Sequence, residues 1–232
     1  MNVLSRKEIT LSASVSCCDL YNLSSQIPQL KKAGVSLLHF DVVDGKFNDC
    51  MILGTPTLAA IRPHTDLPIE VHLGVCEPEK FINQFAEAGA DYIAVHYETL
   101  HNPDLVLSQI RQAGAEPLLA LRAETEVDAG LIRLLPEVDW IIKLTVDPGY
   151  AGQSFKPETL NQIKKLRATI SSFGLKTGIE ADGNINCKTI PLVVEAGADM
   201  LTGGSSGLFV ENEIVEAAAE KMLLTAWHSL KL

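Results

Sequence analysis

Hydrophobic positions along the chain alternate between two patterns: short apolar runs and longer segments whose apolar residues recur every three or four positions. Short runs that are apolar on both faces are typical of strands buried in a parallel sheet, whereas the longer period is typical of helices. The runs predict strands at 9–15, 37–43, 68–75, 92–97, 116–121, 139–146, 176–181 and 199–203. The segments between them predict helices at 20–33, 55–62, 78–88, 103–113, 127–135, 157–173, 187–196 and 211–229.

A repeated Ala-Gly pair marks several junctions between helix and strand. It opens AGVSLLHF (33–40), AGADYIAVH (88–96), AGAEPLLAL (113–121) and AGADMLTGG (196–204). Glycine suits a left-handed helix C-cap, after which the next strand begins. Eight strands alternating with eight helices predict an α/β fold, and this count favours a closed (β/α)8 TIM barrel over an open doubly wound sheet. Because no linker or charge block divides the chain, we expect a single barrel domain over residues 1–232.

Composition narrows the classes of partner. With 47% hydrophobic residues in 232, the chain can bury a sizeable core. A net charge of −10 and a pI of about 5.0 argue against nucleic acid or an anionic membrane as the main partner. A small anionic ligand remains compatible, since helix N-termini bind phosphate through backbone N–H groups. We find no signal peptide and no apolar run long enough to span a bilayer, and we expect a cytoplasmic protein.

The five cysteines, at 17, 18, 50, 76 and 187, are odd in number and form no CxxC motif. They are interpreted as reduced thiols of a cytosolic protein. Cys17 and Cys18 are adjacent, which is compatible with a metal or redox pair, but small buried residues beside a strand end are the favoured interpretation.

Side chains able to bind a metal stand at the carboxyl ends of three predicted strands. His39 and Asp41 lie in LLHFDVVDG, His72 lies in PIEVHLGV, and Asp182 lies in LKTGIEADGN. His39 and Asp41 are two apart, so they point to one face of a strand. In a barrel the four side chains meet at one mouth, where two imidazoles and two carboxylates form a mixed ligand set for a divalent metal.

Three glycine-containing loops follow the last three predicted strands: DPGYAGQSF (147–155), ADGN (181–184) and TGGSSG (202–207). Loops after the last two strands are the usual phosphate site of this fold, because glycines let backbone N–H groups approach the anion. The hydroxyl of Ser205 is a further candidate donor. Ordinary turn glycines explain one such loop, but less easily three at one mouth.

Together these features predict a phosphorylated ligand whose oxygens reach a metal. A metal on a carbonyl and its adjacent hydroxyl stabilises an enediolate. One carboxylate then removes a proton from one face, and the other returns a proton to the opposite face. The expected outcome is inversion at a carbon next to a carbonyl, without net redox change.

Six segments carry a resemblance to a known family: LHFDVVDGKF, VHLGV, AVHYET, LTVDPGYAGQSF, IEADGNI and TGGSSGLF. Through them the chain resembles the ribulose-phosphate 3-epimerase family over nearly its whole length. The resemblance implies a barrel isomerase that inverts C3 of a ketose phosphate, such as D-ribulose 5-phosphate, in pentose phosphate metabolism. It implies one divalent metal (zinc or iron(II), with manganese or cobalt as further candidates) bound by His39, Asp41, His72 and Asp182. It also implies Asp41 and Asp182 as the acid/base pair, and self-association into a homo-oligomer. The substrate-binding and phosphate-binding residues that it implies are Ser14, His72, Gly149, Tyr150, Ala151, Gly152, Gly183, Asn184, Gly204 and Ser205.

The chain departs from the family pattern around the reacting carbon. Where the family usually has methionines, this sequence has Val43, Gly74 and Leu144. Gly74 removes a side chain from the mouth, so a larger or differently shaped pocket is expected. Asn184 replaces a usual glycine beside the phosphate. We therefore hypothesise a paralogue with intact chemistry that acts on another ketose phosphate.

Other functions fit parts of the sequence less well. A Schiff-base aldolase would use Lys143, but the neighbouring Leu144 occupies an inward position, so Lys143 should point outward. A non-catalytic sugar-phosphate binding protein would not need two carboxylates at the metal. A related decarboxylase would require an Asp-x-Lys-x-x-Asp run, which the sequence lacks. For His96 and Glu98, in VHYE, a role at the pocket and a structural role stay equally open.

Overall fold

The predicted strands form a closed parallel barrel in the computed structural model, which describes residues 9–148 and 152–230. The barrel strands are β1 (Thr10–Ser14), β2 (Leu37–Asp44), β4 (Ile69–Gly74), β5 (Tyr92–His96), β6 (Glu116–Leu121), β7 (Trp140–Leu144), β8 (Gly178–Asp182) and β9 (Met200–Gly203). Neighbouring strands run parallel from β2 round to β9, and pairing of β1 with both β9 and β2 closes the barrel. The fold class predicted from the hydrophobic pattern is confirmed.

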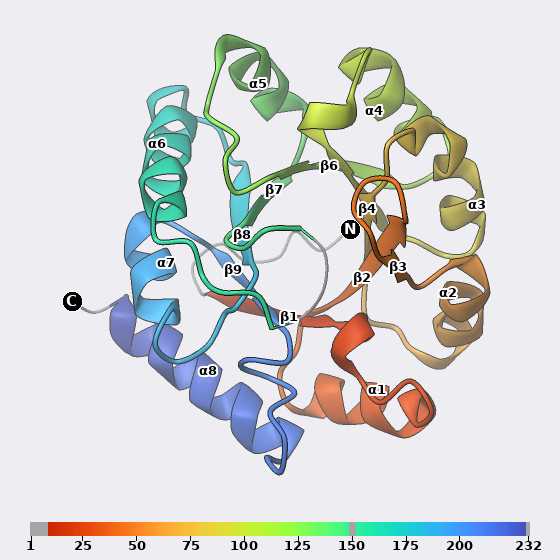
Figure 1. The fold of residues 1–232 in the computed structure, drawn as a ribbon, viewed down its shortest axis with the longest axis vertical. Helices are drawn as coiled ribbons and strands as arrows, with labels where there is room; N and C mark the ends of the chain where they lie inside the picture. Colours follow the sequence, from red (N-terminus) through yellow and green to blue (C-terminus); the bar gives the residue numbers. More distant parts are fainter. Residues whose placement is uncertain (1–8, 149–151, 231–232) are drawn as a thin grey trace.

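Helices surround the strands on the outside, as Figure 1 shows in the view down the barrel. They are α1 (Leu23–Lys32), α2 (Thr55–Ile61), α3 (Ile82–Glu87), α4 (Pro103–Gln112), α5 (Ala129–Leu134), α6 (Thr159–Ser172), α7 (Ile190–Ala196) and α8 (Val215–Ser229). Short 3-10 turns lie at Val15–Cys17, Arg62–His64, Pro78–Lys80, Tyr97–Thr99 and Leu135–Glu137. No helix within the described ranges has both the length and the hydropathy needed to cross a bilayer.

Two local features differ from the sequence-based expectation. The chain forms a ninth strand, β3 (Met51–Ile52), which pairs antiparallel with Val43 and Asp44 at the end of β2. A strand of two residues is too short to produce a hydrophobic period. The helix expected over 78–88 is divided in two: the 3-10 turn Pro78–Lys80 comes first and α3 follows. Phe81 lies between them, where it ends the turn and precedes the first residue of the helix.

The Ala-Gly junctions end their helices as expected. Gly34, Gly89, Gly114 and Gly197 adopt φ values of 88°, 105°, 92° and 114°, which is the left-handed region that favours glycine. Each glycine follows a helix and precedes a barrel strand, so these turns set where α1, α3, α4 and α7 stop and where the next strands start.

The barrel contains an apolar cluster and a set of buried polar side chains. The apolar cluster comes mainly from β5, β6 and β7 and consists of Leu37, Ala94, Leu118, Ala120, Trp140, Ile142, Leu144 and Met200. Trp140 fills the space beside Gly178, where an added Cβ would lie 2.3 Å from the indole ring. Buried polar side chains come from β1, β2, β4, β8 and β9, and include Ser12, His39, Glu70, His72, Glu180 and Thr202. Some of these polar side chains belong to the candidate site.

Candidate functional site

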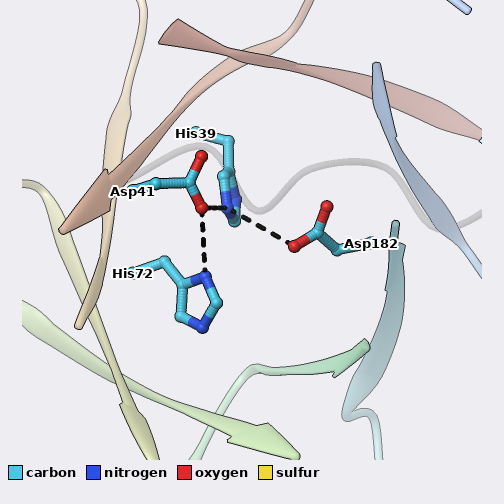
Figure 2. A group of neighbouring side chains, drawn as sticks. All are labelled: His39, Asp41, His72 and Asp182. Carbon is cyan, nitrogen blue, oxygen red and sulfur yellow. Dashed lines mark hydrogen bonds and ion pairs between the residues drawn. The ribbon is translucent and has the colours of Figure 1, made fainter. Parts of the chain in front are cut away.

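The four side chains expected to bind a metal meet at the carboxyl ends of the strands. His39 and Asp41 come from β2, His72 comes from β4, and Asp182 ends β8. The parallel register sets Asp41 beside His72, so alternate residues of both strands reach the same mouth. One nitrogen or oxygen atom from each of the four side chains lies within 4.8 Å of the others. Figure 2 shows them converging on one point.

Asp41 and His39 lie at the centre of this group. Asp41 Oδ1 is 3.0 Å from His39 Nε2 and 3.4 Å from His72 Nδ1, and Asp182 Oδ2 is 3.8 Å from His39 Nε2. Two imidazole nitrogens and two carboxylate oxygens are a ligand set that suits zinc and iron(II), and they converge without rearrangement of the strands. The residues therefore fit a divalent metal ion at this position.

A second layer of carboxylates lies beneath the four side chains. His39 Nδ1 is 2.7 Å from Glu70 Oε1, and this contact leaves Nε2 directed to the centre of the group. Glu180 Oε1 accepts hydrogen bonds from Ser12 and Thr202, each at 2.7 Å. Glu70 and Glu180 were not predicted from the sequence. The available signal was their position, since each precedes His72 or Asp182 by two residues and so shares its face of the strand.

Electrostatics separate the two aspartates. Burial alone would raise the pKa of Asp41, but the charge of His39 and its hydrogen bond hold that pKa well below the ordinary value. Burial raises the pKa of Asp182 to about 6, against the attraction of His39 and with the repulsion of Asp41. His39 shows the opposite balance: burial would lower its pKa, but the charge of Asp41 and hydrogen bonds to Asp41 and Glu70 hold it well above the ordinary value. The site thus contains one firmly ionised carboxylate and one that is easier to protonate.

Two serines orient Asp41. Ser14 Oγ and Ser16 Oγ donate hydrogen bonds to Asp41 Oδ2 over 2.9 Å and 3.0 Å. Ser14, at the end of β1, was expected near the substrate, and it lines the same pocket as Asp41, His72 and Asp182. Ser16 was missed because it lies in the 3-10 turn after β1, beyond the strand whose alternation places Ser14.

The glycine loops line the same pocket as the metal-binding group. Gly152, Gly183, Asn184, Gly204 and Ser205 all contribute to its wall. The structure also brings Gln153 and Ser206 to this wall, which sequence analysis did not propose. Gly149, Tyr150 and Ala151, which were also expected to bind phosphate, lie outside the described residues.

Gly183 and Asn184 form a turn that bends the chain sharply after β8. Gly183 has φ 115° and Asn184 has φ 53°, so asparagine occupies the left-handed conformation that it tolerates better than most residues. Asn184 Nδ2 donates to the carbonyl of Gln153 over 2.6 Å. The replacement of the family's usual glycine thus ties the loop after β8 to the loop after β7.

The positions that depart from the family pattern also line the pocket, and an aromatic ring fills part of the space at Gly74. Val43, Gly74 and Leu144 all contribute to the wall. A Cβ on Gly74 would lie 3.4 Å from Phe47, whose ring lies 4.1 Å below the Arg122 guanidinium. The change at Gly74 therefore alters the shape of the mouth, with Phe47 taking up part of the volume.

Lys143 does not reach the pocket. Its ammonium donates to the carbonyls of Arg122, Ala123 and Thr125 over 2.5, 3.1 and 3.0 Å. Burial lowers its pKa to about 8. Leu144 lines the pocket instead. The alternation argument against Lys143 as a Schiff-base amine is confirmed by this geometry.

His96 and Glu98 are connected to the metal-binding group. His96 is fully buried, and its Nε2 lies 3.0 Å from His72 Nε2. Burial lowers the pKa of His96 to about 4, and a hydrogen bond to Glu98 opposes this shift. His96 therefore lies directly behind a proposed metal ligand, and a role beside the metal-binding group stays a proposal.

The vicinal cysteines are both free thiols. Cys18 is buried, and burial raises its pKa to about 12. Burial also raises the pKa of Cys17, which lines the pocket. Raised pKa values disfavour the thiolate that metal binding or redox chemistry requires. Cys18 is buried, as interpreted from the sequence, whereas Cys17 is only partly buried.

Comparison with known proteins identifies relatives over most of the chain. A family model described as the ribulose-phosphate 3 epimerase family matches residues 10–209. Ribulose-phosphate 3-epimerase of Methanocaldococcus jannaschii is 36% identical over 209 residues, which is 90% of this chain and 88% of that protein. The enzyme of the same name from Synechocystis sp. is 39% identical over 202 residues, or 86% and 87% of the two chains. Among solved structures, 3-hexulose-6-phosphate synthase from Salmonella typhimurium has a TM-score of 0.65 at 17% identity, covers 95% of this chain and 100% of that one, and shows the shared fold.

Proposed function

The chain belongs to the ribulose-phosphate 3-epimerase family of isomerases, and from this premise we propose that it is a metal-dependent epimerase that inverts C3 of a ketose phosphate. The observation that carries the proposal is the pair of carboxylates, Asp41 and Asp182, which approach His39 Nε2 within one pocket whose wall also contains the glycine loops. A pocket with a metal-ligand set, two candidate acid/base groups and an anion-binding wall suits proton transfer at carbon on a phosphorylated sugar.

Phosphate binding is assigned to the loops after β8 and β9. Backbone N–H groups of Gly183, Asn184, Gly204 and Ser205 would receive the anion, with the Ser205 hydroxyl as a further donor. The described residues that line this pocket include no lysine or arginine, so backbone dipoles and not basic side chains would attract the phosphate at this mouth. Gly149, Tyr150, Ala151 and Gly152 are proposed to complete this subsite from the loop after β7.

The metal is proposed to be held by His39, Asp41, His72 and Asp182, with zinc or iron(II) as the favoured ions and manganese or cobalt as alternatives. When bound, such an ion supplies positive charge that stabilises negative charge on the oxygens of the substrate. Ser14 and Ser16 keep Asp41 oriented by donating to its Oδ2, which leaves Oδ1 directed to the histidines.

Asp41 and Asp182 are proposed to transfer the proton. One carboxylate accepts the proton from C3 on one face of the sugar carbon chain, and the protonated partner donates a proton to C3 on the opposite face. One C–H bond breaks and one forms, so the reaction leaves the oxidation state unchanged and exchanges a D-ribulose configuration for a D-xylulose one.

The substrate is proposed to be D-ribulose 5-phosphate with its C3 epimer D-xylulose 5-phosphate, or a related ketose phosphate. Val43, Gly74 and Leu144 stand where the family usually has methionine, and Phe47 enters the space beside Gly74. The resemblance implies that these changes lie around the reacting carbon. They spare the four proposed metal-binding residues, so we infer a different ketose phosphate and not a loss of chemistry.

Proton exchange in D2O tests this function. The metal-loaded protein is incubated with a panel of ketose phosphates, and NMR follows the C3 proton and the appearance of the epimer, with a chelated sample as control. Metal-dependent exchange with epimer formation supports the proposal, and the rates rank the substrates. Absence of exchange across the panel, with metal demonstrably bound, contradicts it. A best catalytic efficiency on D-ribulose 5-phosphate would contradict the paralogue hypothesis alone.

The proposal extends to the setting of the enzyme. We propose one barrel domain over residues 1–232 that assembles into a homo-oligomer and works in the cytoplasm. The five cysteines are all free thiols, as a reducing compartment requires. Light scattering of the purified protein tests assembly, and a monomer at micromolar concentration would contradict it.

A further inference from the structure

His72 presents its two ring nitrogens to two different partners. Nδ1 faces Asp41 Oδ1 at 3.4 Å, and Nε2 lies 3.0 Å from His96 Nε2. Two ring nitrogens at this distance form a hydrogen bond only if one of them carries a proton and the other does not. The protonation pattern of His96 therefore decides which nitrogen of His72 keeps a free lone pair.

Glu98 determines which ring nitrogen of His96 carries the proton. Glu98 Oε1 accepts from the Arg122 backbone N–H over 2.8 Å and from the Thr125 hydroxyl. Glu98 Oε2 lies 3.0 Å from His96 Nδ1. Because an ionised carboxylate only accepts hydrogen bonds, Nδ1 of His96 must carry the proton in this contact. A neutral His96 then has a bare Nε2, to which His72 Nε2–H donates.

The surroundings keep Glu98 and His96 in place. Lys143 donates to three carbonyls of residues 122–125, which fixes the loop that supplies both donors to Glu98. Thr99 Oγ1 donates to the His96 carbonyl over 2.9 Å. The Phe47 ring packs on His96 at 4.5 Å and carries the Arg122 guanidinium near its face, so one cation already lies close to His96. These contacts hold the His96 ring between Glu98 and His72.

We propose that Glu98 and His96 are positioning residues that fix the tautomer of His72, so that Nδ1 and not Nε2 is presented to the metal. The inference rests on the metal site of the proposed function, but it concerns the imidazole and not the reaction. A chain of carboxylate, imidazole and imidazole would orient the ligand ring in the way that a single carboxylate orients most metal-binding histidines.

Long-range 1H–15N NMR of the zinc-loaded protein with labelled histidine reads the tautomers directly. We expect Nε2–H with unprotonated Nδ1 for His72, and Nδ1–H with unprotonated Nε2 for His96. A His72 that carries its proton on Nδ1, or a His96 protonated on both nitrogens, would overturn the inference. This measurement needs zinc but no sugar phosphate, so a failure of the proposed epimerase activity would not change the tautomers that it detects.

The variant Glu98→Gln tests the origin of the pattern. Arg122 N–H and the Thr125 hydroxyl both need the acceptor oxygen of the new amide, so its NH2 group faces His96 Nδ1 and reverses the tautomers of both histidines. We expect zinc affinity, measured by competition with a chromophoric chelator, to fall about 10- to 100-fold, as for other outer partners of metal ligands.

The matched control is Glu124→Gln, which removes a carboxylate from the same loop at an exposed residue outside the chain of hydrogen bonds. It should keep both the tautomers and the zinc affinity of the parent. Circular dichroism of both variants reports whether the fold is retained. A Glu98→Gln protein that keeps the parental tautomers, or binds zinc within twofold of the parent, would contradict the inference.

Discussion

Asp41 and Asp182 have the same carboxyl group in different surroundings. Two serine hydroxyls orient Asp41, and the charge of His39 keeps its pKa low. Asp182 lies farther from His39, and burial raises its pKa to about 6. Without a metal, the two carboxyl groups therefore differ in how readily they are protonated.

Replacement of Asp182 by asparagine tests its role as a proton-transfer group. Asp182→Asn keeps the shape of the side chain but removes the basic site, so the rate of C3 proton exchange should fall about 10²- to 10⁴-fold. Exchange is measured by NMR in D2O with zinc concentrations that saturate the variant. Asp66→Asn, at an exposed residue paired with Lys31, is the control and should exchange at the parental rate. An Asp182→Asn protein within threefold of the parent would exclude this role.

Gly183 is the glycine of the site where a side chain fits least well. It has φ 115°, and an added Cβ would lie 2.5 Å from Val146 Cγ2. Gly183→Ala should lower the free energy of unfolding by about 1–3 kcal/mol, because a left-handed backbone and a steric clash coincide there. Urea unfolding measures this change.

Gly114→Ala provides the comparison for Gly183. Gly114 has φ 92°, but nothing lies within 4 Å of its added Cβ, so this variant isolates the backbone strain from the clash. The loss at Gly183 should be the larger one, and the second substitution Val146→Ala should recover part of it. Equal losses in the two single variants would mean that the contact with Val146 carries no cost.

Among the elements, α5 shows how one side chain joins a helix end to a neighbouring turn. Asp128 caps the helix by accepting from Leu131 N–H over 2.8 Å, and it also accepts from the Tyr97 hydroxyl over 2.9 Å. These hydrogen bonds, to Leu131 first and Tyr97 second, lower the pKa of Asp128 below its ordinary value of 3.8. The carboxylate therefore stabilises the element more than the neutral acid does.

The variant Asp128→Asn tests this contribution, because the carboxylate of the parent titrates and the amide of the variant does not. A carboxyl group whose pKa is lowered by folding contributes stability above its unfolded value, and loses that contribution as pH falls through the folded value. The parent should therefore be the more stable protein at pH 7, with a difference of at most about 1 kcal/mol between the two good capping residues. Urea unfolding at a series of pH values should show this difference shrinking below pH 3.8. A difference that stays constant from pH 7 to pH 3 would contradict the assignment.

At the scale of the whole molecule, the proposed metal links strands that are distant in sequence. Its four ligands come from β2, β4 and β8, so an ion bound by the folded barrel and not by the unfolded chain stabilises the entire fold. Zinc at one hundred times its dissociation constant should add about 2.7 kcal/mol to the free energy of unfolding.

Thermal unfolding with zinc and with a chelator measures this linkage. His72→Gln removes one ligand, so it should reduce the stabilisation at the same zinc concentration. A parent protein that unfolds at the same temperature in zinc and in chelator would contradict the proposed site.

The sequence predicts the elements of this barrel well because they depend on local patterns. Apolar runs and helical periods locate the eight barrel strands, and Ala-Gly pairs locate helix ends at Gly34, Gly89, Gly114 and Gly197. The two-residue strand β3 and the break before α3 were missed, because so few residues give no periodic signal. The four proposed metal ligands were found because each stands at the end of a recognisable strand.

Other parts of the site depend on which strands become neighbours. Glu70 meets His39 through the pairing of β2 with β4, and His96 meets His72 through the pairing of β4 with β5. Phe47 reaches the space at Gly74 from the loop after β2. Periodicity and strand ends are properties of neighbouring residues, so the sequence alone determined the barrel and the candidate ligands. Register, side-chain direction and burial arise only when the strands pair, so the tertiary structure decided how the ligands are oriented and what shape the pocket takes.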